Sequence, residues 1–231
     1  MLEFQGVRLT LGDFRLSADF SISSGARVAV IGPSGSGKST LLSLIAGFLH
    51  PDQGAIRWNG RDLAPVPPGQ RPVSILFQDQ NLFPHLTVAQ NTGLGLRPDL
   101  RLNRDQKAAV AAALARVGLS GMETRRPAQL SGGQQSRVAL ARVLLRARPI
   151  LLLDEPFGAL GPALKAEMLA LLAEIATDTG ATVLMVTHDP ADARTFAPET
   201  LLVQDRRAHP PMSTAPLLDN PPPGLRDYLG G

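Results

Sequence analysis

Apolar and polar residues alternate along the first 22 residues, in two stretches separated by Gly12-Asp13. Strict alternation is typical of strands with one buried face, and a Gly-Asp pair between two such runs favours a turn. The chain is therefore expected to begin with an antiparallel sheet. The alternating apolar residues are Val7, Leu9 and Leu11, then Phe14, Leu16, Ala18, Phe20 and Ile22.

Further along, short continuous apolar runs replace the alternation. Residues 27–31, 73–77, 150–153 and 182–186 are strand-length runs of this kind. Helical patterns at 40–48 and 162–177 each follow one of these strands, and such order is typical of a parallel sheet covered by helices. The pattern predicts an α/β fold.

Residues 87–145 are rich in Ala, Leu, Arg and Gln at helical spacing, which predicts an inserted helical subdomain over 84–147 within a single domain of 1–231. Residues 54–60 contain Asn59-Gly60 and predict a second hairpin. The last 26 residues, 206–231, hold six of the 20 prolines and are expected to form an irregular, loosely packed tail.

Composition excludes several classes of protein. There are no cysteines, so disulfide scaffolds and thiolate metal sites are excluded. The net charge is only +3, and Lys and Arg nowhere cluster, which argues against a nucleic-acid partner. No apolar run approaches the roughly 20 residues that cross a bilayer, and no secretory signal is visible. We expect a soluble, cytoplasmic chain.

A glycine-rich segment joins the strand at 27–31 to the following helix. Glycines flank four residues, and Lys and Ser then follow, which is the phosphate-loop pattern. Backbone amides of such a loop point at phosphates, the lysine reaches the β- and γ-phosphates, and the serine hydroxyl binds Mg²⁺. The predicted nucleotide-binding residues are Gly32, Pro33, Ser34, Gly35, Ser36, Gly37, Lys38, Ser39 and Thr40.

Two acids, Asp154 and Glu155, end the apolar strand at 150–153. Adjacent carboxylates at the end of a buried strand are costly unless they face a cation or a reacting group. Asp154 is the candidate Mg²⁺ ligand and Glu155 the candidate general base for an attacking water. The alternative is a solvated strand end without a function.

Leu130-Ser131-Gly132-Gly133-Gln134 opens another helix and, taken alone, could be only a cap. Together with the phosphate loop and the acid pair, it resembles the signature of the ATP-binding cassette (ABC) ATPases. Gln78 and His188 fall in the family's order after their strands. The resemblance, from about residue 2 to 203, implies a P-loop NTPase (RecA-like) core with an N-terminal antiparallel β-subdomain.

The resemblance also implies roles for single residues. ATP would lie between the phosphate loop of one chain and Ser131, Gly132, Gly133 and Gln134 of a second, in a head-to-tail homodimer. Glu155, His188 and Gln78 would be catalytic, Ser39, Gln78 and Asp154 would hold Mg²⁺, and Leu11 would contact adenine.

Within the family the chain is most similar to the ATPase subunits of bacterial thiamine importers, in stretches such as 41–49, 71–78 and 81–91. This implies a separate integral-membrane permease, a periplasmic substrate-binding protein and a place on the cytoplasmic face of the inner membrane. The 43 residues after His188 are too few for the regulatory domain common in related importers.

Three positions depart from the family pattern. Gly161 stands where an aspartate is usual, Leu11 where an aromatic residue is common, with Phe14 as a candidate substitute, and no arginine directly follows Gln134. The alternatives to thiamine import are import of another small solute, export, or a soluble cassette ATPase acting on DNA or the ribosome.

Overall fold

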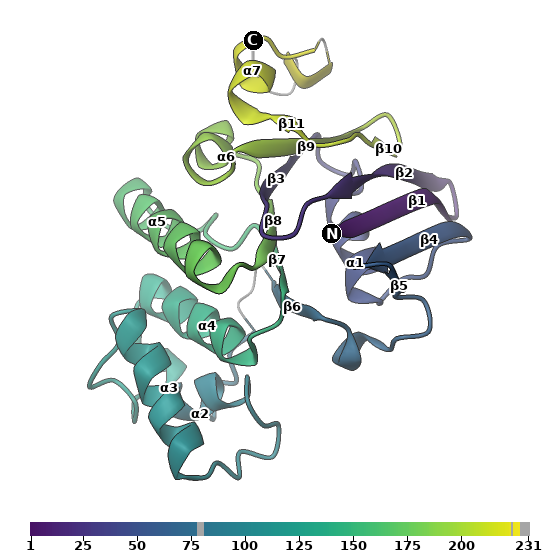
Figure 1. Cartoon of the computed structure of the whole chain (residues 1–231). Coiled ribbons are helices and arrows are strands. Elements are labelled where there is room, and N and C mark those ends of the chain that lie inside the picture. Colours follow the sequence, from purple (N-terminus) through teal and green to yellow (C-terminus); the bar gives the residue numbers. More distant parts are fainter. Residues whose placement is uncertain (78–80, 223, 227–231) are drawn as a thin grey trace.

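The computed structural model describes residues 1–77, 81–222 and 224–226. These residues form one sheet of 11 strands with helices on both faces (Figure 1), so the expected α/β fold is confirmed. Along the sheet the order is β5-β4-β1-β2-β10-β9-β3-β8-β7-β6, and β11 pairs with β9.

The middle of the sheet is parallel and buried on both faces. Strands β3 (Arg27–Ile31), β8 (Thr182–Val186), β7 (Ile150–Asp154) and β6 (Val73–Leu76) pair in that order, and β9 (Glu199–Gln204) lies on the other side of β3. Their continuous apolar sequences match this double burial. All five strands point the same way, so the loops that follow β3, β7 and β8 meet at one edge.

The other half of the sheet is antiparallel. Strands β1 (Leu2–Leu11) and β2 (Phe14–Ile22) pair through the Gly12-Asp13 turn, with Leu11 opposite Phe14, as the alternation predicted. Strand β4 (Gln53–Trp58) pairs with β1 and turns at Asn59-Gly60 into β5 (Arg61–Asp62). Both turn residues have positive φ, 48° and 77°, as tight hairpin turns of this kind require.

Helix α1 (Lys38–Ala46) lies on one face of the parallel strands, and α4 (Gly132–Arg146) and α5 (Pro162–Thr179) lie on the other (Figure 1). Helices α2 (Val88–Gly93) and α3 (Arg104–Arg116) pack beside α4 around a separate apolar cluster that includes Val88, Leu114 and Val138. The helices expected within 84–147 are therefore present. None of the helices in the described ranges is long and apolar enough to cross a membrane.

The end of the chain is better packed than its prolines suggested. Helix α6 (Pro190–Phe196) leads to β9, followed by β10 (Arg207–Ala208), β11 (Met212–Ser213) and α7 (Thr214–Asp219). Leu217, Leu218 and Leu225 are buried in the same core as α5 and β8. The expectation of loose packing is wrong for the described part of this segment, because these leucines cover apolar surface beside β9.

Candidate nucleotide-binding and hydrolysis site

The phosphate loop leaves β3 and enters α1 with no room for side chains at two glycines. A Cβ on Gly32, whose φ is 150°, would lie 2.0 Å from the carbonyl oxygen of Val203. A Cβ on Gly37, whose φ is 108°, would lie 2.7 Å from the ring of Phe14. The loop therefore packs against β9 at Gly32 and against the β1–β2 hairpin at Gly37, and only glycine fits at these two positions.

Lys38, the first residue of α1, folds its side chain back over this loop. Its ammonium group donates to the carbonyl oxygens of Gly32 at 2.8 Å and Pro33 at 2.9 Å. Burial lowers the pKa of Lys38, while the carboxylates of Glu155 and Asp154 act in the opposite direction. The phosphate-loop lysine and the two acids at the end of β7 therefore lie within electrostatic reach of one another, as the sequence implied.

Asp154 ends β7 beside the start of α1. Burial raises the pKa of its carboxyl group, and a hydrogen bond from the Ser39 side chain acts against that rise. A carboxylate and a hydroxyl in contact are the hard oxygen donors that Mg²⁺ prefers, so these two residues fit a magnesium site. In the described ranges no cluster of three or more His, Cys, Asp or Glu side chains could hold a metal.

Glu155 is held in an unusual backbone conformation. Its φ is 46°, in the left-handed region that a residue with a Cβ seldom adopts, and its amide donates to Val186 of β8 at 3.1 Å. The Glu155 carboxylate lies 3.1 Å from Nδ1 of His188, and the Glu155 side chain is 26% exposed. A constrained, half-buried, paired carboxylate is unlike a solvated strand end, so the geometry favours a functional acid.

Ser131 and Gln134 cap the start of α4 through two reciprocal hydrogen bonds. The Ser131 hydroxyl accepts from the Gln134 amide at 3.3 Å, and the Gln134 side chain accepts from the Ser131 amide at 3.0 Å. A Cβ on Gly132 would meet nothing, whereas one on Gly133 would lie 2.2 Å from Leu164 of α5. Gly133 therefore lets α4 pack closely against α5.

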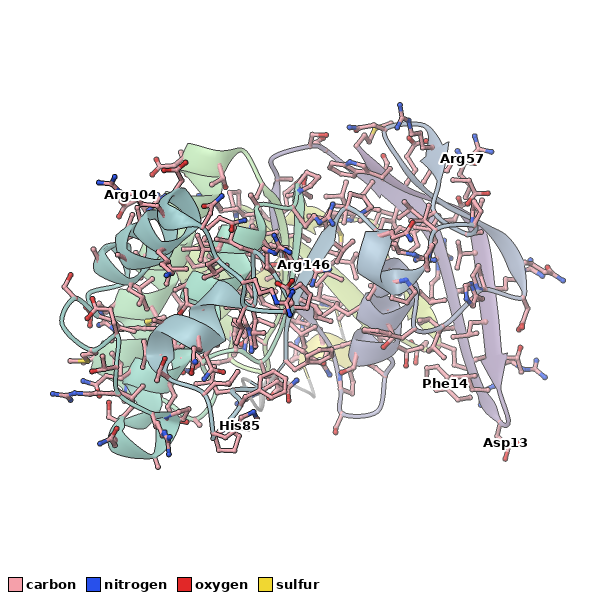
Figure 2. The ribbon with its side chains drawn as sticks, turned by 90° about the horizontal axis from the view of Figure 1, so that it is seen from below. Asp13, Phe14, Arg57, His85, Arg104 and Arg146 are labelled. Carbon is pink, nitrogen blue, oxygen red and sulfur yellow. The ribbon has the colours of Figure 1, made fainter. Side chains whose placement is uncertain are left out.

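The remaining predicted residues lie in different places. Leu11 is 44% exposed and lies opposite Phe14 at the end of β1. Phe14 follows the turn residue Asp13 at the tip of the hairpin (Figure 2) and packs on the phosphate loop. Gln78 lies outside the described residues. Gly161 is exposed at the start of α5, where a Cβ would meet nothing and no side chain caps the helix.

Two buried polar residues that support this region gave no distinct sequence signal. Arg71, 2% exposed, donates to the carbonyl oxygens of Leu44 and Ile45 at the end of α1, at 2.8 and 2.9 Å. A cation at the carboxyl end of a helix stabilises it, so Arg71 fixes the helix that carries Lys38. Asn91 of α2 bonds to both backbone groups of Phe83 and so fixes the preceding loop.

Comparison with known proteins agrees with this geometry. The family model described as ABC transporter matches residues 16–158. The chain is 64% identical to the thiamine import ATP-binding protein ThiQ of Cereibacter sphaeroides over the full length of both, and 58% identical to that of a Ruegeria species, again over both full lengths.

A solved structure similar to this one is the dimeric ATP-binding cassette MJ0796 bound to ADP and Pi. The TM-score is 0.78 at 30% identity, over 93% of this chain and 99% of that one. The matching family, the full-length relatives and the shared cassette fold lead to one conclusion: this chain belongs to the ABC transporter family, as one of its ATP-binding, ATP-hydrolysing cassettes.

Proposed function

We propose that this chain is the ATPase subunit of an importer that takes up thiamine or its phosphates through a separate membrane permease. The observation that carries the ATPase part is the convergence of Lys38, Asp154 and the Glu155–His188 pair at one edge of the sheet. The relatives named for thiamine import, 58% and 64% identical over full length, support the cargo.

ATP binds with its phosphates against the amides of residues 32–40 and the Lys38 ammonium. The lysine exchanges its bonds to Gly32 and Pro33 for bonds to phosphate oxygens, which neutralise its charge better than carbonyls do. The Ser39 hydroxyl and the Asp154 carboxylate, with Gln78, hold Mg²⁺, which supplies charge neutralisation for the phosphates. Leu11 offers its exposed apolar side chain to the adenine.

Glu155 acts as the general base. Its carboxylate takes a proton from a water molecule as the water oxygen attacks the γ-phosphorus, and the bond to the bridging oxygen of ADP breaks. His188 holds the Glu155 carboxylate in place through the 3.1 Å contact and contacts the γ-phosphate. The backbone of Glu155, with a φ of 46°, leaves the extended conformation of β7 directly after Asp154.

The active unit is a head-to-tail homodimer. Helices α1 and α4 lie on opposite faces of the parallel strands (Figure 1). This arrangement supports a site in which Ser131 and its neighbours contact the ATP that is bound to the phosphate loop of a second chain. Ser131, Gly132, Gly133 and Gln134 then place the positive start of α4 against the γ-phosphate. The similar cassette MJ0796 is dimeric, which supports a dimer here.

The partner in the membrane is an integral permease, which receives its solute from a periplasmic substrate-binding protein, so the ATPase lies on the cytoplasmic face of the inner membrane. Phe48 and Phe77, 53% and 37% exposed, have ring centroids 6.2 Å apart and form an aromatic pair on the surface. Exposed aromatic pairs are typical of protein contacts. We assign this pair to the permease interface.

The experiment that tests hydrolysis is the Glu155→Gln variant of the purified chain. Loss of the base is expected to lower the ATP turnover by about 10²–10⁴-fold. ATP binding persists, and ATP-bound dimers accumulate in sizing chromatography. Glu174→Gln, which neutralises an exposed acid on α5, is the matched control and keeps the wild-type rate. Near-normal hydrolysis by Glu155→Gln would remove Glu155 from this role.

A further inference from the structure

Helices α5 and α6 lie side by side (Figure 1), and the side chain of Lys165 joins them. Its ammonium group lies 2.7 Å from the Asp189 carboxylate and 3.1 Å from the Asp192 carboxylate. The Lys165 and Asp192 side chains are only 16% and 12% exposed, so water and salt screen their charges in part. These contacts therefore hold α5 and α6 together more firmly than an ion pair on the open surface does.

The same two carboxylates fix the chain on both sides of His188. Before the histidine, the Thr187 hydroxyl donates to Asp192 at 2.9 Å and accepts from the Asp189 amide at 3.1 Å. After it, the Asp189 carboxylate accepts from the Ala191 amide at 2.9 Å and so caps α6. Both neighbours of His188 are therefore held by hydrogen bonds.

Two backbone hydrogen bonds connect this network to other parts of the site. The Thr187 amide donates at 3.2 Å to the carbonyl oxygen of Val30, near the end of β3, where the phosphate loop begins. The Lys165 amide donates at 2.9 Å to the carbonyl oxygen of Gly161, which places Lys165 in the first turn of α5. Lys165 therefore links the start of α5 to the histidine that follows β8.

The position of the His188 ring depends on this backbone. Its side chain is 58% exposed, and Nδ1 lies 3.1 Å from the Glu155 carboxylate. Without the Lys165 ammonium, two carboxylates would face each other with no cation between them, and their repulsion would displace Asp189. Because Asp189 directly follows His188, that displacement would move the ring relative to Glu155.

We propose that Lys165 is a positioning residue for ATP hydrolysis, which holds His188 at the Glu155 carboxylate. Lys165 contacts neither Glu155 nor the nucleotide, and it acts through the backbone of residues 187–189. The inference rests on the proposed function, because that function assigns Glu155 and His188 to hydrolysis. An ion pair that only stabilises the fold would leave the turnover of the folded chain unchanged.

Lys165→Met in the purified full-length chain removes the charge and keeps most of the side-chain volume. We expect kcat for ATP to fall by about 10–100-fold, because a small displacement of a catalytic group has an effect of this size. ADP has no γ-phosphate for His188 to contact, so it should bind with unchanged affinity by calorimetry. Unchanged ADP binding also verifies that the variant is folded.

Two further variants separate positioning from loss of any ion pair on α6. Lys165→Arg keeps a cation that can donate to both acids, and its kcat should stay within about threefold of wild type. Arg194→Met is the matched control, because it removes the ion pair of Arg194 on α6 with Asp219, which lies away from His188 in sequence and is largely exposed. It should keep the wild-type rate.

A double-mutant cycle tests whether Lys165 acts through His188. His188→Ala alone should lower kcat. Adding Lys165→Met to His188→Ala should change kcat by less than about twofold, because the side chain that Lys165 positions is already gone. Two residues that act independently would instead give losses that multiply.

The outcomes distinguish this inference from the proposed function. A wild-type rate in Lys165→Met, an equal loss in Lys165→Arg or in Arg194→Met, or losses that multiply in the cycle would overturn the positioning role. Each of these results leaves the roles of Glu155 and His188 intact. A wild-type rate in His188→Ala would remove His188 from the proposed function, and the positioning role of Lys165 would fail with it.

Discussion

Single residues decide how tightly this cassette holds its nucleotide. Leu11 and Phe14 face each other across the end of the β1–β2 hairpin, yet they have different surroundings. The Phe14 ring packs on Gly37 and so supports the phosphate loop, whereas Leu11 is largely exposed. We therefore propose that the adenine base contacts the aliphatic side chain of Leu11, which cannot stack as a ring does.

The Leu11→Tyr variant tests this assignment. Stacking of an aromatic ring on a base contributes about 1–3 kcal/mol, so ATP should bind roughly tenfold more tightly to the variant. Inorganic tripolyphosphate, which lacks the base, is the matched control ligand and should bind with unchanged affinity. Equal ATP affinities for wild type and variant, measured by calorimetry, would place the adenine elsewhere.

The parts of the site that can be predicted from the sequence are those made of consecutive residues. The phosphate loop and the Asp154-Glu155 pair were predictable because each needs particular residue types in consecutive positions. Arg71 could not be predicted as buried, since its partners are the carbonyl oxygens of Leu44 and Ile45, which many residue types could supply. The packing of Leu217 and Leu225 depends on the distant apolar surface that they cover.

Among the elements, α4 and α5 act as a pair. Leu164 of α5 lies over Gly133, and Glu167 of α5 pairs with Arg137 of α4 at 2.6 Å. Arg137 also donates to the carbonyl oxygen of Val117 beyond the end of α3. The arginine expected directly after Gln134 is absent, but an arginine three residues along α4 joins α3, α4 and α5.

Two adjacent glycines at the start of α4 should respond differently to alanine. Alanine improves helix propensity by up to about 1 kcal/mol, so Gly132→Ala should raise the free energy of unfolding. Gly133→Ala should be at least about 1 kcal/mol less stable than Gly132→Ala, because its methyl group meets Leu164. Urea unfolding measures both, and adding Leu164→Ala to Gly133→Ala should reduce the difference. Equal stabilities of the two single variants would contradict the close packing.

A second cluster ties α5 to α6. Lys165 lies 2.7 Å from Asp189 and 3.1 Å from Asp192, and the Thr187 hydroxyl also donates to Asp192. The hydrogen bond from Lys165 lowers the pKa of Asp189 below its usual 3.8, and the same bond raises the pKa of Lys165. Because Asp189 directly follows His188, this cluster fixes the backbone that presents the histidine.

The pH dependence of Lys165→Met follows from these shifts. Asp189 has a lowered folded-state pKa, so its contribution is present above the unfolded pKa near 3.8 and is lost as the pH falls through the lower folded value. Lys165 has a raised pKa, so its contribution is lost only above about 10.5. The variant should be less stable than wild type at pH 7 by urea unfolding, and the difference should shrink as the pH falls below the unfolded value of 3.8. A difference that stays constant into acid would show that Lys165 acts only through packing.

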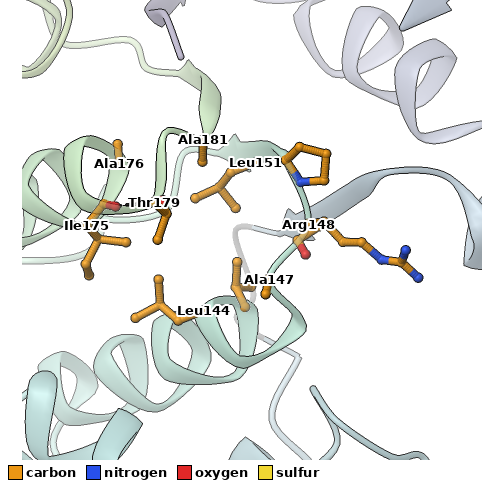
Figure 3. Close-up of a pocket in the computed structure, with 11 residues that line it drawn as sticks. Leu144, Ala147, Arg148, Leu151, Ile175, Ala176, Thr179 and Ala181 are labelled. Carbon is orange, nitrogen blue, oxygen red and sulfur yellow. Dashed lines mark hydrogen bonds between the residues drawn. The ribbon is translucent and has the colours of Figure 1, made fainter. Parts of the chain in front are cut away.

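At the scale of the whole molecule, the two ends of the parallel strands carry different features. The edge at the carboxyl ends of the parallel strands gathers the phosphate loop, Asp154, Glu155 and His188. The opposite edge carries a cavity of about 370 Å³ between Leu144 of α4 and Ile175 of α5 (Figure 3). The same two helices, α4 and α5, extend between them, so the catalytic edge and the cavity share rigid elements.

We propose that Gly161 affects the proposed dimer rather than the fold of one chain. It begins α5 without a side-chain cap, and space for a carboxylate is available there. Within one chain, replacing this glycine with aspartate changes helix capping by only a few tenths of a kcal/mol. If Gly161→Asp has a larger effect, we assign that effect to the interface between the two chains of the proposed dimer.

Uptake of labelled thiamine at low external concentration is the measurement that tests the central claim most directly. Cells in which the gene is deleted should lose uptake, and the wild-type gene should restore it. The Glu155→Gln gene should not restore it, although the protein is present at normal levels, whereas the Glu174→Gln gene should. Unchanged uptake in the deletion strain would contradict thiamine as the cargo, and full rescue by Glu155→Gln would contradict the coupling of transport to hydrolysis at Glu155.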